Sequence, residues 1–325
     1  MRRLWVLCLT LVLTASSLTG CGASSAQTAK TSEESESLQI VTTIFPVYDW
    51  AREILAGNDN VTLIFLADDG VDMHSFQPTV GDFLNISTCD LFIYVGGESD
   101  QWVEDALQGA VNEEMQVINL MDVLGEDIRE EERVEGMEGE DDDGEEAEYD
   151  EHIWLSLRNA ETLSGVIAET LAEIDPEHAE LYTENAAAYA EELSALDSSY
   201  QEVVDTSAQN TLLFGDRFPF RYLVDDYGLS YYAAFAGCSS ETEASFETIV
   251  FLAEKVDELG LGSILTIENS DQTIATAIQQ NTQDKNQQIL TMHSMQSVTL
   301  EEAEAGTTYL SLAEENLEVL REALK

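Results

Sequence analysis

Three of the chain's four histidines lie at places where a metal ion could bind. His74 lies in the loop after the apolar run VTLIFLA, His152 follows the most acidic stretch, and His293 directly follows the run QILTM. Neutral imidazole is a good ligand for zinc, copper, nickel and iron. The placement of three scarce imidazoles at the boundaries of structural elements therefore indicates a metal site.

Two carboxylates follow other strand-like runs in the same way. Asp216 comes directly after TLLFG, and Glu268 ends the run SILTIE. In open α/β sheets, ligands bind outside the carboxyl ends of the strands, and two such sheets that face each other form a cleft. We therefore expect both carboxylates to converge on one cleft with His74 and His293. Three imidazoles with one oxygen donor favour zinc, because manganese sites are richer in carboxylates.

The elements that must position these residues alternate along the chain, which is the α/β pattern. In the first half, β-rich runs predict strands over 38–44, 61–66, 90–96 and 116–120. Amphipathic stretches predict helices over 48–55, 80–86 and 102–109. The second half repeats the order, with strands over 211–215, 230–235, 263–267 and 288–292 and helices over 222–226, 245–259, 272–281 and 310–324. We predict an α/β fold of two Rossmann-like lobes, each a mostly parallel sheet flanked by helices, over residues 38–176 and 207–325.

One long helix is predicted between the lobes, over residues 177–206. Asp175 and Pro176 read as an N-cap followed by proline at the first helical position, which starts a helix cleanly. At 1.5 Å per residue the helix is roughly 40 Å long, so we expect it to join and brace both lobes, with the metal site in the cleft between them. Apolar side chains recur along it at alternating spacings of four and three, at Tyr182, Ala186, Tyr189, Leu193, Leu196, Tyr200 and Val203.

The first twenty residues have the pattern of a signal peptide. Two arginines supply the positive end, residues 4–15 are mostly apolar, and residues 18–21 resemble a bacterial lipoprotein cleavage box. Cleavage would leave Cys21 as a diacylated N-terminus at the start of a flexible tether over residues 21–37. An uncleaved anchor is disfavoured, because the apolar part is shorter than the roughly 20 residues that span a bilayer. We therefore predict an extracytoplasmic protein that is lipid-anchored to the cell membrane.

The formal net charge of −52 excludes some partners. Such a surface repels nucleic acid and anionic headgroups and attracts cations, so attachment to a membrane must come from the lipid. Residues 126–151 hold sixteen carboxylates and two arginines, and such blocks repel themselves, so we predict an acidic disordered loop there. This loop is interpreted either as a mobile, low-affinity cation trap or as a solvated insertion that maintains solubility.

Two cysteines remain after the predicted signal and lipidation site are set aside. Cys89 and Cys238 could form one disulfide in an exported protein. Each also lies beside strand-like or core-like sequence, so two free buried thiols are an equal alternative.

Six segments are typical of one protein family: VTTIFPVYDWAREI, DMHSFQPTVGDFLNISTCDLFIYVGG, DEHIWLSLRNA, YLVDDYGL, GCSSETEAS and YLSLAEENLEVLREAL. Through them, and over nearly all of the mature chain, the sequence resembles the cluster A-I solute-binding lipoproteins that serve zinc and manganese ABC transporters. The resemblance places His74 and His152 at the first two ligand positions. It implies a receptor, not an enzyme, that carries zinc, or manganese as the second choice, to an ABC permease and its cytoplasmic ATPase. We expect this receptor to be a monomer.

The chain departs from the family at the third ligand position. Counting back from Tyr222 gives Arg217, where relatives usually have His or Glu, and a guanidinium does not bind a cation. Either Asp216 serves through a one-residue shift, or Arg217 pairs with a carboxylate and leaves the position to water. The fourth position, often Asp in relatives, is His293 in TMHSM. The predicted metal ligands are therefore His74, His152, His293 and Asp216, with Glu241 and Glu268 in reserve.

Two other functions remain open. Three histidines with an open fourth position also describe catalytic zinc, which would make the protein a zinc-dependent hydrolase. The chain has neither an H-E-x-x-H motif nor a nucleophile elbow, which counts against that function. The second of these two functions is that of a surface adhesin, which would need an exposed apolar or aromatic patch.

Overall fold

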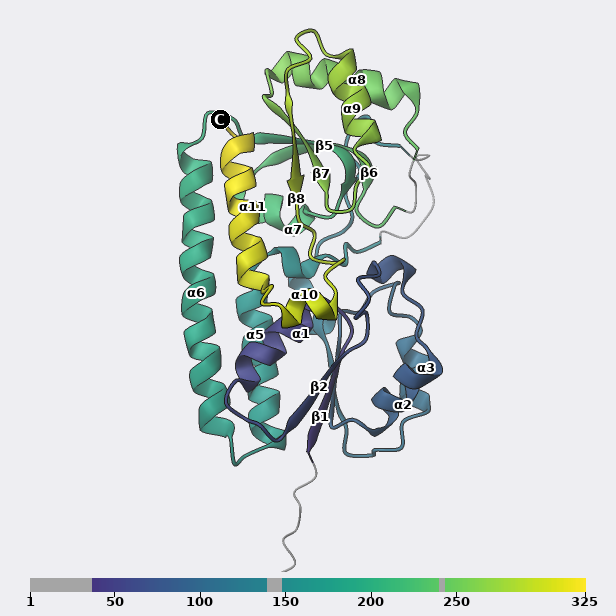
Figure 1. Ribbon diagram of the computed structural model, residues 1–325, viewed down its shortest axis with the longest axis vertical. Helices are drawn as coiled ribbons and strands as arrows, with labels where there is room; N and C mark the ends of the chain where they lie inside the picture. Colours follow the sequence, from purple (N-terminus) through teal and green to yellow (C-terminus); the bar gives the residue numbers. More distant parts are fainter. Residues whose placement is uncertain (1–36, 139–147, 240–242) are drawn as a thin grey trace, which may run out of the picture. The chain divides into compact units, whose positions relative to one another are not determined.

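The computed structural model describes residues 37–138, 148–239 and 243–325. Each lobe contains a four-stranded parallel sheet (Figure 1). The first sheet has the order β2-β1-β3-β4, with β1 (Leu38–Thr42), β2 (Val61–Phe65), β3 (Leu91–Tyr94) and β4 (Gln116–Asn119). The second has the order β6-β5-β7-β8, with β5 (Thr211–Phe218), β6 (Ser230–Ala236), β7 (Ser263–Ile267) and β8 (Gln288–Met292). These strands overlap the predicted runs, which confirms the α/β fold with two parallel sheets. β5 continues to Phe218, so Asp216 lies within this strand, whereas the sequence predicted it directly after the strand.

Each sheet contains a point at which the chain reverses its direction of travel across the strands. β1 pairs with β2 on one side and with β3 on the other, and β5 is likewise flanked by β6 and β7. Such a switch point leaves a crevice at the carboxyl ends of the strands, where ligands bind in open α/β sheets. His74 follows β2 and Cys238 follows β6, so both residues lie beyond these strand ends.

Helices cover both faces of the first sheet. In β1, Ile40 packs in the same core cluster as α1 (Phe45–Leu55) and α5 (Leu157–Ile174). The next residue, Val41, points to the opposite face and packs with α2 (Val80–Thr88) and α3 (Val103–Gln108). A fifth, short helix is α4 (Leu120–Leu124). The sequence predicted α1, α2 and α3 but not α4 or α5.

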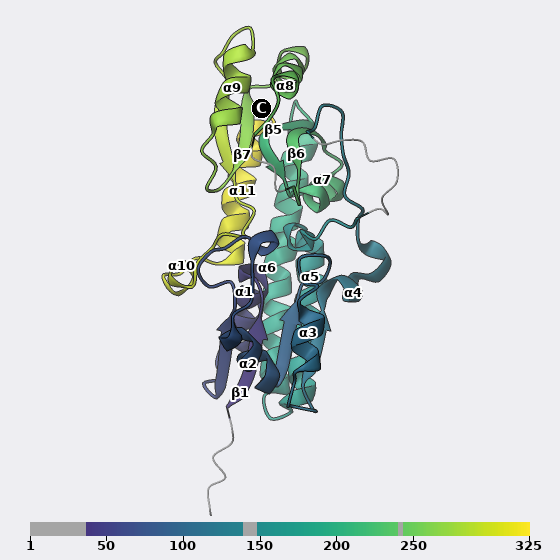
Figure 2. The ribbon, with the colours of Figure 1, turned by 90° about the vertical axis from the view of Figure 1, so that its right-hand side faces the viewer.

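The long helix α6 (Ala179–Thr206) has 28 residues and runs beside both lobes (Figures 1 and 2). The side chain of Asn185 donates to the carbonyl of Ile54 in the first lobe, over 2.9 Å. Tyr200 Oη donates to the carbonyl of Ala313 in the second lobe, over 2.6 Å. α6 is therefore anchored to both lobes, as the sequence predicted for a helix over residues 177–206. Ala186 of the predicted stripe is only half-buried. The other six positions of the stripe are the buried side chains of α6, at Tyr182, Tyr189, Leu193, Leu196, Tyr200 and Val203.

The remaining helices belong to the second lobe and to its junction with the first. The sequence predicted α7 (Arg221–Tyr227), α8 (Phe246–Leu259), α9 (Thr273–Asn281) and α11 (Tyr309–Ala323), and it missed the short α10 (Leu300–Glu304). One hydrophobic core cluster contains side chains from both lobes and from α6, so the lobes share a continuous core. Within the described residues, none of the helices is both long enough and apolar enough to cross a bilayer.

Both ends of the acidic segment 126–151 contact the second lobe. At the first end, Arg129 Nε lies 2.7 Å from Asp225 Oδ2, and the Glu138 backbone N–H donates to the Ala234 carbonyl over 2.8 Å. At the other end, Tyr222 Oη donates to the Asp150 carbonyl over 2.9 Å. These contacts hold residues 126–138 and 148–151 in place, although the sequence predicted disorder over the whole segment. The middle of the segment lies outside the described residues, as do the predicted signal peptide and Cys21.

Candidate metal centre

His74 is placed by a short helical turn, η1 (Met73–Ser75), that follows β2. Asp72 caps this turn, because its carboxylate accepts the His74 backbone N–H over 3.0 Å. The ring Nδ1 lies 2.8 Å from Ser99 Oγ and 3.5 Å from a carboxylate oxygen of Glu151. With Nδ1 engaged on this side, the Nε2 atom is directed toward the opposite side of the ring.

His152 is fully buried at the start of the turn η3 (Ile153–Leu155). One carboxylate oxygen of Asp150 accepts the His152 backbone N–H over 2.8 Å and lies 3.0 Å from the ring Nδ1. A carboxylate on the rear nitrogen is the usual support of a metal-binding histidine, because it fixes the ring and raises its basicity. Asp150 therefore leaves Nε2 as the nitrogen available to a ligand.

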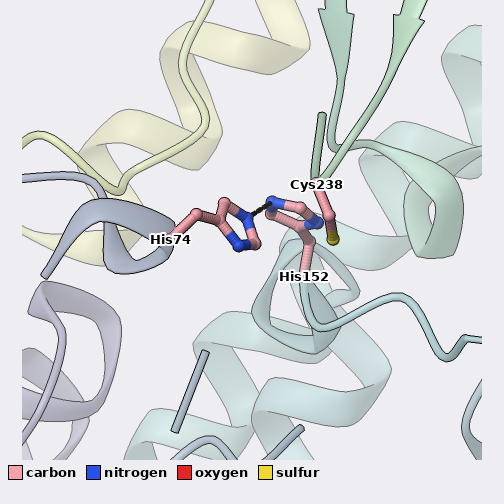
Figure 3. Close-up of side chains that lie close together, drawn as sticks. All are labelled: His74, His152 and Cys238. Carbon is pink, nitrogen blue, oxygen red and sulfur yellow. Dashed lines mark hydrogen bonds between the residues drawn. The ribbon is translucent and has the colours of Figure 1, made fainter. Parts of the chain in front are cut away.

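The two Nε2 atoms lie 3.2 Å apart (Figure 3). Two nitrogens bound at about 2.0–2.1 Å to a tetrahedral zinc ion are about 3.3 Å apart. The separation of the two rings thus fits a zinc ion bound to both, with little movement of either side chain.

Cys238 is the third member of this group. Its sulfur and one ring nitrogen from each of His74 and His152 lie within 4.8 Å of one another. Cys238 and Cys89 are both free thiols, as in the second alternative left open by the sequence, but only Cys89 is buried and Cys238 is half-buried. The sequence analysis did not predict Cys238 as a ligand, although its position just after the run SYYAAF is the kind of strand end that drew attention to Asp216.

A glycine allows the chain to bring Cys238 to this position. A Cβ atom on Gly237 would lie 2.8 Å from the carbonyl oxygen of Phe218 and 3.1 Å from Cε1 of His152. The Cys238 backbone N–H then donates to a carboxylate oxygen of Glu131 over 3.2 Å, which fixes the turn after β6. The absence of a side chain at residue 237 is therefore required for the close approach of this turn to His152.

We predict that Gly237→Ala weakens zinc binding by about 10–100-fold, the range seen when groups that support a ligand are changed. The added methyl group must push the Cys238 turn away from His152. A chelator-competition titration measures the affinity. Gly165→Ala is the matched control, because a Cβ atom there meets nothing within 4 Å. Equal affinities for the two variants would contradict the packing argument.

The pKa values of His74 and His152 are shifted in opposite directions. The pKa of His74 is lowered to about 4, first by burial and then by the neighbouring His152 ring. Burial also lowers the pKa of His152, but Asp150 outweighs it and holds the pKa above the ordinary value. Burial raises the pKa of the Cys238 thiol, with a further contribution from Asp150. At neutral pH, His74 is therefore neutral, and a proton on the pair belongs to His152.

His293 is held in separate contacts on the second lobe. Its Nδ1 accepts the Met295 backbone N–H over 2.8 Å and lies 3.5 Å from a carboxylate oxygen of Glu268. Asn316 fixes its backbone, accepting the N–H over 2.6 Å and donating to the carbonyl over 2.8 Å. Glu268 in turn accepts the backbone N–H and hydroxyl of Ser294. The structure does not bring His293 into the three-donor group.

Asp216 and Arg217 line a cavity of about 600 Å³ between the lobes, together with Glu268 and Asp72. Asp216 accepts the backbone N–H groups of Arg217 over 2.8 Å and of Ile267 over 3.4 Å. Arg217 Nη2 lies 2.7 Å from Asp72 Oδ2, so it pairs with a carboxylate across the cleft, one of the two arrangements expected from the sequence. Glu241 lies outside the described residues.

Comparisons with known proteins identify the family of the chain. The family model described as ZnuA, zinc-uptake complex component A periplasmic, matches residues 40–323. The zinc-binding lipoprotein AdcA of Streptococcus pneumoniae serotype 4 is 32% identical over 291 residues, which cover 88% of this chain and 55% of AdcA. The high-affinity zinc uptake system protein ZnuA of Bacillus subtilis is 26% identical over 313 residues, which cover 94% of this chain and 92% of that protein.

A solved structure is also similar to this chain over most of its length. The Zn(II)-bound ZnuA-like domain of S. pneumoniae AdcA has a TM-score of 0.69 and 27% identity, over 88% of this chain and 98% of that domain. The chain spans about half the length of AdcA. The family is one of binding components, so the hydrolase alternative is not supported. Because the match extends over most of the sequence, this chain belongs to the zinc-uptake complex component A (ZnuA) family.

Proposed function

We propose that this chain is the extracytoplasmic receptor of a zinc importer. The observation that carries the proposal is the pair of Nε2 atoms, 3.2 Å apart, on the rings of His74 and His152. Each ring is held from behind, by Ser99 and by Asp150. Rings that are oriented before the ion arrives lose little conformational entropy on binding it, which favours high affinity.

A fourth ligand is needed beyond the three-donor group, because zinc in a closed site is tetrahedral. We propose that it comes from the second lobe. His293 and Asp216 are the first candidates, with Glu268 and Glu241 in reserve. A ligand from this lobe would join the two sides of the cleft, so that binding of the ion couples to a small closure limited by α6.

The names of the relatives support zinc as the cargo. AdcA is described as a zinc-binding lipoprotein and the B. subtilis relative as part of a high-affinity zinc uptake system. None of these names supports manganese. A structure described as the laminin-binding adhesin Lmb of Streptococcus agalactiae is also similar, with a TM-score of 0.71 and 25% identity. The metal centre gives no reason to prefer adhesion for this chain.

The rest of the transport cycle follows from the proposed receptor role. The lipid on Cys21 would hold the receptor beside the membrane, where it would deliver zinc as a monomer to an ABC permease driven by a cytoplasmic ATPase. The acidic segment 126–151 would raise the local cation concentration near the cleft. Its carboxylates alone would bind weakly and would not select zinc over calcium or magnesium.

A competition titration with a zinc chelator tests the proposal, on protein that begins after Cys21. Residues 37–325 form a compact unit by themselves, so this form should fold. We expect one tightly bound zinc ion per chain and much weaker manganese binding. His293→Ala and Asp216→Asn then show which residue supplies the fourth ligand. An absence of stoichiometric zinc binding would refute the receptor role.

A further inference from the structure

We propose that the Cys238 thiolate is a direct ligand of the transported ion and that this sulfur donor sets the preference for zinc over manganese. The inference rests on the proposed receptor function and adds a specificity-determining residue to it. It starts from the group of three donor atoms, in which the Cys238 sulfur and a nitrogen from each of His74 and His152 lie within 4.8 Å. Figure 3 shows Cys238 arriving from the end of a strand, across from His74, with His152 between them.

The surroundings of Cys238 do not account for it as an ordinary core residue. The other free cysteine, Cys89, belongs to a hydrophobic cluster, where its sulfur contacts the carbonyl of Ile86 and the sulfur of Met115. Cys238 belongs to none of the hydrophobic clusters formed by the described residues. It lies among polar groups, with its backbone held by Glu131 and its thiol beside the two histidines.

Arg217, the residue at the family's third ligand position, is held in an ion pair and offers no donor atom for a metal ion. Arg217 is paired with Asp72 across the cleft, and its charge would repel an ion in any case. Both carboxylate oxygens of the neighbouring Asp216 accept backbone N–H groups. In the arrangement described, Cys238 is therefore the donor that the second lobe places beside the histidine pair.

The chemistry of the step is a simple exchange. The S–H bond of Cys238 breaks heterolytically, its proton passes to solvent, and the sulfur electron pair binds the ion. Zinc accepts thiolate at about 2.3 Å together with imidazole at about 2.0–2.1 Å. Manganese favours carboxylate, carbonyl and water oxygens, so a site with two nitrogens and a sulfur disfavours it. The set of donors thus selects zinc without any requirement on cavity size.

The experiment compares wild type with Cys238→Ser, Cys238→Asp and the control Cys89→Ala, which removes the other thiol. Zinc and manganese affinities are measured by chelator competition. Cobalt(II) is titrated as a spectroscopic probe, because it occupies zinc sites and gives a near-ultraviolet charge-transfer band when a thiolate is bound. This band can be sought in the wild-type protein, so the test does not depend on any variant folding.

We expect the cobalt–thiolate band in wild type and Cys89→Ala and its loss in Cys238→Ser. Cys238→Ser should weaken zinc binding by at least about 100-fold, the upper end of the effect of groups that only support a ligand. Cys238→Asp should lower the ratio of the zinc affinity to the manganese affinity. Tight zinc binding without the band, or with unchanged affinity in Cys238→Ser, would overturn this inference and leave the receptor function intact. A wild-type protein that binds no zinc would overturn both.

Discussion

Replacing His152 by alanine is expected to weaken zinc binding by well over 100-fold and to have the largest effect of any single change at this site. His152 is fully buried, and one of its ring nitrogens lies within 4.8 Å of the donor atoms of His74 and Cys238. Loss of a residue that only supports a ligand costs about 10–100-fold, and His152 is proposed to bind the ion itself. The same variant also leaves the buried carboxylate of Asp150 without its imidazole partner.

Chelator-competition titration measures this effect, and His178→Ala is the matched control. His178 lies at the start of α6, where its ring is 2.8 Å from Asp175 and outside the metal centre. The control should keep the wild-type affinity. Thermal unfolding with excess zinc and with chelator provides a second readout, because an ion that binds only the folded protein raises Tm. A zinc-dependent rise in Tm that persisted in His152→Ala would show that the ion binds elsewhere.

The fold could be predicted from the sequence because its strands are short apolar runs between polar turns. β3 and β7 show this well, since nearly every residue of LFIY and SILTI is buried, as expected for parallel strands covered on both faces. Helix α5 was missed although its pattern is present in the sequence. Leu157, Ala160, Leu163, Ile167 and Leu171 recur at spacings of three and four and form its buried face.

The candidate site was only partly predictable. His74 and His152 were named from their places at element boundaries, and the structure brings their rings together. Cys238 could not be separated by sequence from a structural thiol, because its role depends on a close approach that Gly237 permits. His293 directly follows β8, as predicted, whereas Asp216 lies within β5 and not after it. A position near a strand end does not say which way a side chain turns. Both carboxylate oxygens of Asp216 and the Nδ1 atom of His293 accept backbone N–H groups, and the role of the two residues as ligands remains a prediction.

Zinc affinity is expected to fall steeply with decreasing pH, by about 100-fold per pH unit between pH 6 and pH 5. The number of protons that zinc must displace sets this slope, at about tenfold per pH unit for each proton. The pKa of His74 is lowered to about 4, so this ring is neutral throughout the range and releases no proton. The pKa of His152 is raised above 6.5 and that of the Cys238 thiol is raised above 9.0, so each releases one.

Competition titrations at half-unit steps from pH 5 to pH 7.5 measure the slope, and a variant separates the two protons. Cys238→Ser should reduce it to about tenfold per pH unit, because only the His152 proton is then displaced. Cys89→Ala should keep the wild-type slope, since its thiol lies in a hydrophobic cluster away from the site. Titrations extended below pH 5 should show the curve steepening again near pH 4, as His74 gains its proton. An affinity that stayed constant from pH 5 to pH 7.5 would exclude both His152 and Cys238 as ligands, because each must lose a proton before it can bind zinc.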